Sequence, residues 1–222
     1  MKSIVFDTSS VISIMTNNLM DTLIKLKQDS GVNYVITDEI KRELLDVPLQ
    51  GKKYKLEAIM LSHYLNKYFK TFSNLNFESM TNYILEKCNT LFSINGKALK
   101  LVDKAEVEGL VVAMISNADA YVVDERTMRL IVENPRRLHK LLEKKFHSKI
   151  EVDYKILREF ETKFENIEIL RSSELMVTAY YKNLFVKYNY DEQILEALLW
   201  GLRLRGCSIS REDIDAVMKL KR

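Results

Sequence analysis

The chain has 222 residues, of which 47% are hydrophobic and 29% are charged, the composition of an ordinary soluble protein. Lysine and arginine number 34 against 31 acidic residues, and the formal charge of +3 is only weak support for an RNA partner. Cys88 and Cys207 form no CxxC pair, which argues against a disulfide framework and a zinc site. The longest apolar run, residues 110–115, is far too short to span a bilayer, and no secretory signal is present, so we expect a cytoplasmic protein that binds no membrane.

The first predicted element is a strand at residues 4–6, whose sequence Ile-Val-Phe shows no polar alternation. Such a run is typical of a central parallel strand buried on both faces. Asp7 follows directly and would stand at the carboxyl end of this strand, the edge at which open α/β sheets bind ligands. Thr8 and Ser9 come next, and each either fixes a carboxylate or a metal-bound water, or caps the following helix.

The rest of the chain alternates between predicted helices and strands. Thr37 and Asn134 are expected as N-caps, and Ser210 with Asp213 as a capping box. Residues 51–100 are rich in lysine and aromatic residues at helical spacing, which predicts two inserted helices. The other predicted helices lie at 19–27, 38–46, 103–115, after 124, 135–146, 153–164, 172–185, 191–205 and from 210, and the other predicted strands at 34–36, 120–123 and 167–170.

Strands that alternate with helices, without hairpin dipeptides, predict an α/β fold of three layers, in which helices cover both faces of a central parallel sheet. Six glycines and two prolines leave little room for flexible linkers, so helix should dominate. We expect a single domain over residues 1–222, with a helical insertion at 51–100 and a helical C-terminal extension at 191–222.

Two of the predicted strands end in an aspartate. Asp7 follows Ile-Val-Phe, and Asp124 follows Tyr-Val-Val. Because the carboxyl ends of parallel strands lie at one edge of a sheet, we expect both carboxylates there. The helices that follow parallel strands begin at the same edge, so their early turns can add further carboxylates.

Glu43 and Glu106 are the helical glutamates best placed to reach this edge. At about 100° per residue, Glu43 lies roughly 60° from Ile40 on the buried stripe of its helix. Glu106 lies on the apolar face of its helix, whereas Glu108 is rotated by about 200° toward solvent. Asp103 lies near the face of Glu106 and is a further ligand candidate, although the two residues could form only a capping box.

Four carboxylates gathered at one edge have to be neutralised. Two carboxylates about 4 Å apart repel by roughly 4 kcal/mol at an effective dielectric constant near 20, so the group must bind a cation or take up protons. Oxygen ligands without histidine or cysteine nearby favour Mg²⁺ or Mn²⁺. Each acid also has an ordinary alternative, as a helix cap or as a solvated glutamate.

In the order and spacing of five segments, the sequence resembles the PIN-domain nucleases. The segments are FDTSSVI (6–12), VITDEIKRELL (35–45), AEVEGLVVAMISNADAYVVDE (105–125) and, more loosely, IEILRSSELMVTAYYKNLF (167–185) and LLWGLRLRGCSISREDIDAVM (198–218). The four catalytic, metal-binding acids of the family are matched in chain order by Asp7, Glu43, Glu106 and Asp124. The resemblance also places Glu125 where many members carry a second acid, and Ser9 where a small polar residue supports the metal ligands, whereas Val122 replaces a frequent Thr or Ser.

This resemblance implies a metal-dependent ribonuclease, and more specifically an endoribonuclease, that hydrolyses RNA phosphodiester bonds with Mg²⁺ or Mn²⁺ held by the four carboxylates. Cations near the acidic cleft would hold the phosphates of single-stranded or structured RNA, although for any one of them taken alone a solvated helix face is the commoner role. The substrate-binding candidates are Ser9, Arg126, Arg129 and a stripe spaced i, i+4 and i+8, Arg136, Lys140 and Lys144.

Two other functions are compatible with the sequence. A non-catalytic PIN-like module would hold RNA or a protein partner without cleaving it. A phosphatase of the haloacid-dehalogenase type also places an aspartate after its first strand, but Ser9 stands where the DxD motif of that family has its second acid. A homodimer is compatible with either function.

Overall fold

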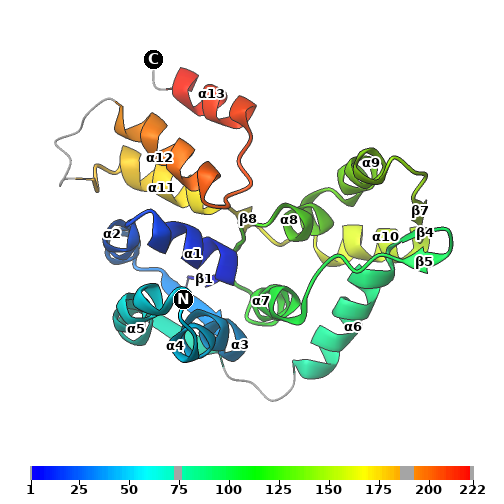
Figure 1. Ribbon diagram of the computed structural model, residues 1–222, viewed down its shortest axis with the longest axis horizontal. Helices are drawn as coiled ribbons and strands as arrows, with labels where there is room; N and C mark the ends of the chain where they lie inside the picture. Colours follow the sequence, from blue (N-terminus) through cyan, green and yellow to red (C-terminus); the bar gives the residue numbers. More distant parts are fainter. Residues whose placement is uncertain (1, 73–76, 186–192, 221–222) are drawn as a thin grey trace.

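The computed structural model describes residues 2–72, 77–185 and 193–220, and these residues fold around a central sheet of parallel strands (Figure 1). The strand order in this sheet is β3-β2-β1-β6-β8. Its members are β1 (Ser3–Phe6), β2 (Asn33–Thr37), β3 (Phe69–Phe72), β6 (Ala120–Val122) and β8 (Ile169–Leu170). The expected α/β fold with a central parallel sheet is therefore confirmed.

Helices pack against both faces of the sheet. Successive side chains of a strand point to opposite faces, and here apolar side chains on both faces are buried by helices. Ile4 and Phe6 of β1 belong to one core and Val5 to the other. The first core is completed by α1 (Thr8–Thr16), α2 (Met20–Ser30), α3 (Asp38–Lys41), α5 (Lys55–Tyr68), α11 (Ser172–Tyr181), α12 (Ile194–Leu204) and α13 (Arg211–Leu220). The second core is completed by α6 (Glu78–Thr90), α7 (Lys104–Ile115), α8 (Arg126–Glu133), α9 (Pro135–Phe146) and α10 (Tyr154–Lys163).

Residues 51–100 correct the expectation of a purely helical insertion. Between α5 and α6 the chain forms β3, which pairs with β2 as the edge strand of the main sheet. After α6 it forms β4 (Phe92–Ile94) and β5 (Lys97–Ala98), which join β7 (Glu151–Val152) in a small antiparallel sheet. The ring centroid of Phe69 lies 5.4 Å from those of both Phe6 and Tyr34. These contacts across the sheet favour a strand at residues 69–72, although the spacing of apolar residues there predicts a helix.

The predicted N-caps and the predicted capping box are confirmed. Thr37 Oγ1 accepts a hydrogen bond from Ile40 N at 3.1 Å, and Asn134 Oδ1 accepts one from Arg137 N at 2.9 Å. The expected capping box at residues 210–213 forms through two reciprocal hydrogen bonds. The C-terminal extension contains α12 and α13, and residues 191, 192, 221 and 222 of the predicted extension lie outside the described part of the chain. No helix among the described residues has the length and apolarity to cross a bilayer.

One tyrosine joins the sheet closely to α7. Tyr121 of β6 is fully buried, and its hydroxyl donates a hydrogen bond to the carbonyl oxygen of Glu106 at 3.0 Å. Its ring lies against the backbone at Gly109, where an added Cβ would stand 2.8 Å from Cε2 and from the hydroxyl oxygen of Tyr121. Only glycine lets α7 approach the sheet this closely.

We therefore predict that Gly109→Ala destabilises the protein. The gain in helix propensity of about 1 kcal/mol is outweighed by overpacking, and we expect a net loss of about 1–2 kcal/mol in the free energy of unfolding in urea. Gly51→Ala is the matched control, because its added Cβ would meet nothing closer than 3.7 Å. If Gly109→Ala proved as stable as the wild type, the close packing of α7 on Tyr121 would be contradicted.

Candidate active site

Asp7 lies at the junction of β1 and α1. Its backbone N–H donates to the carbonyl oxygen of Val122 at 2.9 Å, so it continues the pairing of β1 with β6. Its carboxylate then caps α1 by accepting hydrogen bonds from the N–H and the hydroxyl of Ser9. The residue is only 2% exposed. A negative charge is thus held inside the protein at the carboxyl edge of the sheet.

The three hydroxyl residues after Asp7 have separate roles. Thr8 Oγ1 donates to Glu43 Oε2 at 2.6 Å, so Thr8 fixes a carboxylate. The hydroxyl of Ser9 donates to Asp7 and accepts a hydrogen bond from Asp124 N at 3.3 Å. The hydroxyl of Ser10 lies 2.8 Å from the carbonyl oxygen of Asp7 and 3.1 Å from that of Val122. Ser9 consequently both supports a carboxylate and belongs to the cap of α1.

Glu43 reaches this edge from a π-helical turn, Arg42–Asp46, which lies between α3 and the short helix α4 (Val47–Gln50). The extra residue of a π turn lets Leu44 and Leu45 stay buried while Glu43, half-buried, meets Thr8. The expected inward direction of Glu43 is therefore found, although the sequence pattern predicts an ordinary α-helix here.

Glu106 stands in the first turn of α7. Its Oε2 accepts a hydrogen bond from Asp103 N at 2.8 Å, so the two residues form a capping box. Burial raises the pKa of Glu106 to about 7, against the lowering effect of the Asp103 N–H, and the charges of Asp7 and Glu125 raise it further. Asp103 itself is exposed and pairs with Lys100 at 2.7 Å.

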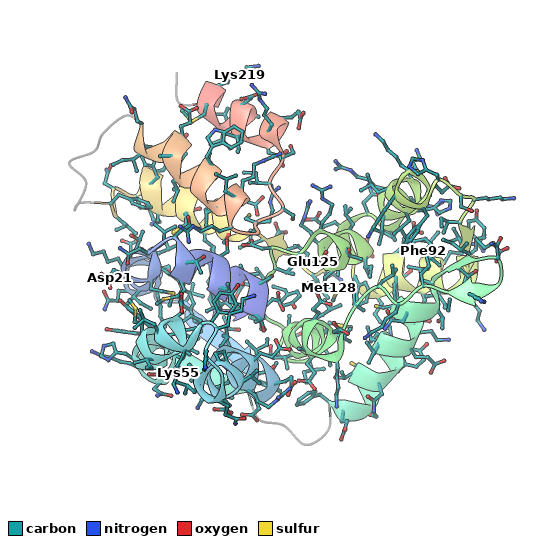
Figure 2. All side chains as sticks on the ribbon, in the orientation of Figure 1. Asp21, Lys55, Phe92, Glu125, Met128 and Lys219 are labelled. Carbon is teal, nitrogen blue, oxygen red and sulfur yellow. The ribbon has the colours of Figure 1, made fainter. Side chains whose placement is uncertain are left out.

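Burial also raises the pKa of Asp7, from its ordinary value of 3.8 to about 6, although hydrogen bonds from Ser9 and Thr8 lower it; the charge of Glu43 adds to the rise. These electrostatic effects link four carboxylates: Glu43 acts on Asp7, and Asp7 and Glu125 act on Glu106. We call them the carboxylate group: Asp7, Glu43, Glu106 and Glu125. Figure 2 shows Glu125 near the middle of the molecule, at the start of α8.

Asp124 occupies a different position. It is fully buried, and its two oxygens accept hydrogen bonds from the N–H of Ser172 at 2.8 Å and from the hydroxyl of Ser172 at 2.6 Å. It thereby ties the end of β6 to the start of α11. Burial and the charge of Asp124 raise the pKa of the Cys207 thiol to about 11. Ser172 was not among the candidates, and the only sequence signal for it is a pair of hydroxyl residues after the last predicted strand.

Glu108 corrects an expectation, because it does not face solvent. Its residue is 8% exposed, and its carboxylate lies 3.8 Å from Lys104 Nζ. Burial raises its pKa against the lowering effect of Lys104, and the charges of Glu39, Glu78 and Glu43 add to the rise. Since α3 and α6 both pack on α7, the side of α7 that periodicity assigns to solvent is covered.

The predicted substrate-binding cations are spread over two helices. Arg126 is exposed and Arg129 pairs with Glu133 at 2.8 Å, both on α8, the helix that follows Glu125. The stripe on α9 lies on another arm of the molecule, where Arg136 and Lys140 line a pocket with residues of β4 and β7. Lys144 is exposed further along α9. The structure therefore does not gather the α9 stripe with the carboxylates.

An apolar pocket adjoins Glu43 between α1, α4 and α5. It contains about 440 Å³ of empty volume, part of it open to solvent. Its lining residues are Ile12, Met15, Thr16, Glu43, Leu44, Pro48, Tyr54, Glu57, Ala58 and Leu61.

The carboxylate group offers the type of ligand atom that a hard divalent cation prefers. All of its side-chain donors are oxygens, and none of the four acids forms an ion pair with a cationic side chain of the described residues. As they stand, however, the described residues include no set of three acidic, histidine or cysteine side chains arranged to hold a metal ion. Hydrogen bonds from Ser9, Thr8 and Asp103 N occupy one oxygen each of Asp7, Glu43 and Glu106.

Comparisons of this chain with protein-family models, with curated proteins and with solved structures find no match.

The raised pKa of Asp7 generates a prediction for stability. Below pH 3.8 the carboxyl is protonated in both states, and above pH 6 it is ionised in both. Between these values the unfolded chain has lost the proton while the folded protein still holds it, so the free energy of unfolding falls as the pH rises from about 4 to about 6. Asp7→Asn keeps the cap and removes the charge. We expect its free energy of unfolding at pH 7.5 to exceed that of the wild type by up to about 3 kcal/mol, with the two values converging near pH 4.

Denaturant unfolding at several pH values measures this difference, in the absence of divalent cations. Asp46→Asn is the control, because Asp46 is an exposed aspartate, at the end of the π-helical turn, whose charge stays in water. A difference between Asp7→Asn and the wild type that did not change with pH would show that the buried charge is not its cause.

Proposed function

We propose that the protein is a metal-dependent ribonuclease of the PIN type, an endoribonuclease that hydrolyses RNA with Mg²⁺ or Mn²⁺. One observation supports this above the others: Asp7, Glu43, Glu106 and Glu125 come from separate segments of the chain, act on one another electrostatically, and lack an ion-pair partner among the described residues. Uncompensated carboxylates of this kind bind a cation or take up protons.

In this proposal Asp7 and Glu43 hold the cation, together with Glu106, whose Oε1 is free of the capping box. Glu125 completes the set, since its Oε2 caps α8 at Met128 N and its Oε1 is available. A bound divalent ion supplies a water molecule of lowered pKa and neutralises charge on the phosphate. Asp124, which the resemblance makes the fourth acid, accepts one hydrogen bond from Ser172 at each oxygen and so orders the end of β6 beside the start of α11.

Two features of this edge suit a phosphodiester substrate. Thr8 and Ser9 hold the orientation of the carboxylates, so that these side chains need little rearrangement when the substrate binds. Arg126 is exposed one residue after Glu125, and it is the nearest candidate in sequence to offset the repulsion between the carboxylates and an RNA phosphate.

We predict cleavage of single-stranded RNA in Mn²⁺ or Mg²⁺ that is abolished by chelation. Asp7→Asn and Glu106→Gln should each lower the cleavage rate by roughly 100-fold or more, because each removes a charge that holds the ion. Glu86→Gln, which removes the charge of an exposed glutamate on α6 outside the carboxylate group, is the control and should retain activity. Gel analysis of a labelled RNA measures the rate and shows whether internal bonds are cut.

Calorimetric titration with Mn²⁺ separates binding from cleavage. We expect the wild type to bind Mn²⁺ at pH 8 and to bind it more weakly at pH 5.5, where Asp7 and Glu106 take up protons. Equal cleavage by the wild type and by Asp7→Asn would contradict the proposal and would indicate a contaminating nuclease. RNA binding without any cleavage in Mn²⁺ would favour the non-catalytic module instead.

A further inference from the structure

A second pocket lies on the arm formed by α9, α10 and the small antiparallel sheet. It contains about 630 Å³ of empty volume, part of it open to solvent. Figure 2 labels Phe92 on this arm, well away from Glu125. The lining residues are Phe92, Arg136, His139, Lys140, Val152, Tyr154 and Leu157, three of them aromatic and two permanently basic. The pocket thus combines flat apolar surface with positive charge.

The aromatic rings of this pocket are differently constrained. Phe92 is fully buried, and the ring of His139 stacks on it in parallel, with 5.8 Å between centroids and 3° between planes. His139 Nε2 also lies 2.9 Å from the carbonyl oxygen of Ile150, so its ring is fixed while one part remains exposed. Tyr154, the first residue of α10, is 60% exposed. A planar ligand could therefore stack on a free tyrosine beside a fixed histidine.

The two cations have groups free to bind an anion. Glu161 holds Arg136 through Nε at 2.8 Å and Nη2 at 3.3 Å, which leaves Nη1 without a hydrogen-bond partner among the described residues. Lys140 has no ion-pair partner in the described part of the chain. The acidic groups around the pocket are partnered elsewhere: Glu161 holds Arg136, Glu143 lies 3.6 Å from His139, and Glu151 and Asp153 accept hydrogen bonds from Ser93 and from the first turn of α10. A guanidinium fixed by one carboxylate is already oriented for a phosphate on its open side.

We infer that this pocket binds a nucleoside phosphate, with its base stacked on Tyr154 beside His139 and its phosphate held by Arg136 and Lys140. The aromatic surface favours a ligand with a planar base over a plain inorganic anion. The two cations favour a ligand with a phosphate over a neutral apolar one. A free nucleotide and one nucleotide unit of an RNA strand share this chemistry. The site is separate from the carboxylate group and requires no metal ion.

The test is calorimetric titration of the full chain in EDTA with AMP, with inorganic phosphate and with a 12-nucleotide single-stranded RNA. We predict that Tyr154→Ala and Lys140→Ala each weaken binding of AMP or of the RNA by about tenfold, since stacking on one aromatic side chain contributes about 1–3 kcal/mol. Binding of AMP itself identifies a free nucleotide as the ligand. Binding of the RNA alone identifies a nucleotide unit of a strand.

Two exposed residues provide matched controls. Tyr181→Ala removes a tyrosine that is 52% exposed on α11, and Lys145→Ala removes a lysine of α9 that lies over the ring of Phe146. Neither should change binding, and thermal unfolding checks that all variants are folded. Unchanged affinity in both Tyr154→Ala and Lys140→Ala would overturn the inference, as would phosphate binding as tight as that of AMP. Because EDTA removes divalent ions, these results are independent of whether the carboxylate group supports cleavage.

Discussion

The burial of the Asp7 carboxylate, where β1 ends and α1 begins, is the constraint around which this edge of the sheet is built. A charge that is almost fully excluded from water is tolerated only when hydrogen bonds support it, and Ser9 supplies two of them. The same serine hydroxyl accepts from Asp124 N, and Asp124 in turn accepts from Ser172. One chain of polar contacts therefore links β1, α1, β6 and α11.

This arrangement divides the acidic residues into two kinds. Asp124 accepts a hydrogen bond from Ser172 at each oxygen and connects the end of β6 to the start of α11. Asp7 and Glu106 have raised pKa values because burial and neighbouring carboxylates disfavour their charged forms. Acids whose pKa values are raised in this way cluster at functional sites in proteins. The distinction supports the proposed role of the carboxylate group.

Features that depend on neighbouring residues can be predicted from the sequence. Features that depend on contacts between distant parts of the chain cannot. The caps at Thr37 and Asn134 depend on residues three positions away, and both are found. Strand β3 was missed because its burial depends on Phe69 meeting Phe6, 63 positions earlier in the chain. The burial of Glu108 was missed because helical periodicity shows which side of a helix is polar but not which other helices cover it. Strand ends and helix faces allow the electrostatic influence of Glu43 on Asp7 and of Asp7 on Glu106 to be anticipated, whereas nothing in the sequence identifies Ser172 as the partner of Asp124.

The π-helical turn at Arg42–Asp46 restricts how this chain can evolve. A deletion of one residue there would convert the turn to regular α-helix and remove the extra residue that lets Glu43 meet Thr8 while Leu44 and Leu45 stay buried. Either Glu43 would leave Thr8, or Leu44 would leave the core. Descendants of this sequence should therefore vary more freely in the identity of the solvent-facing residues of this segment than in its length.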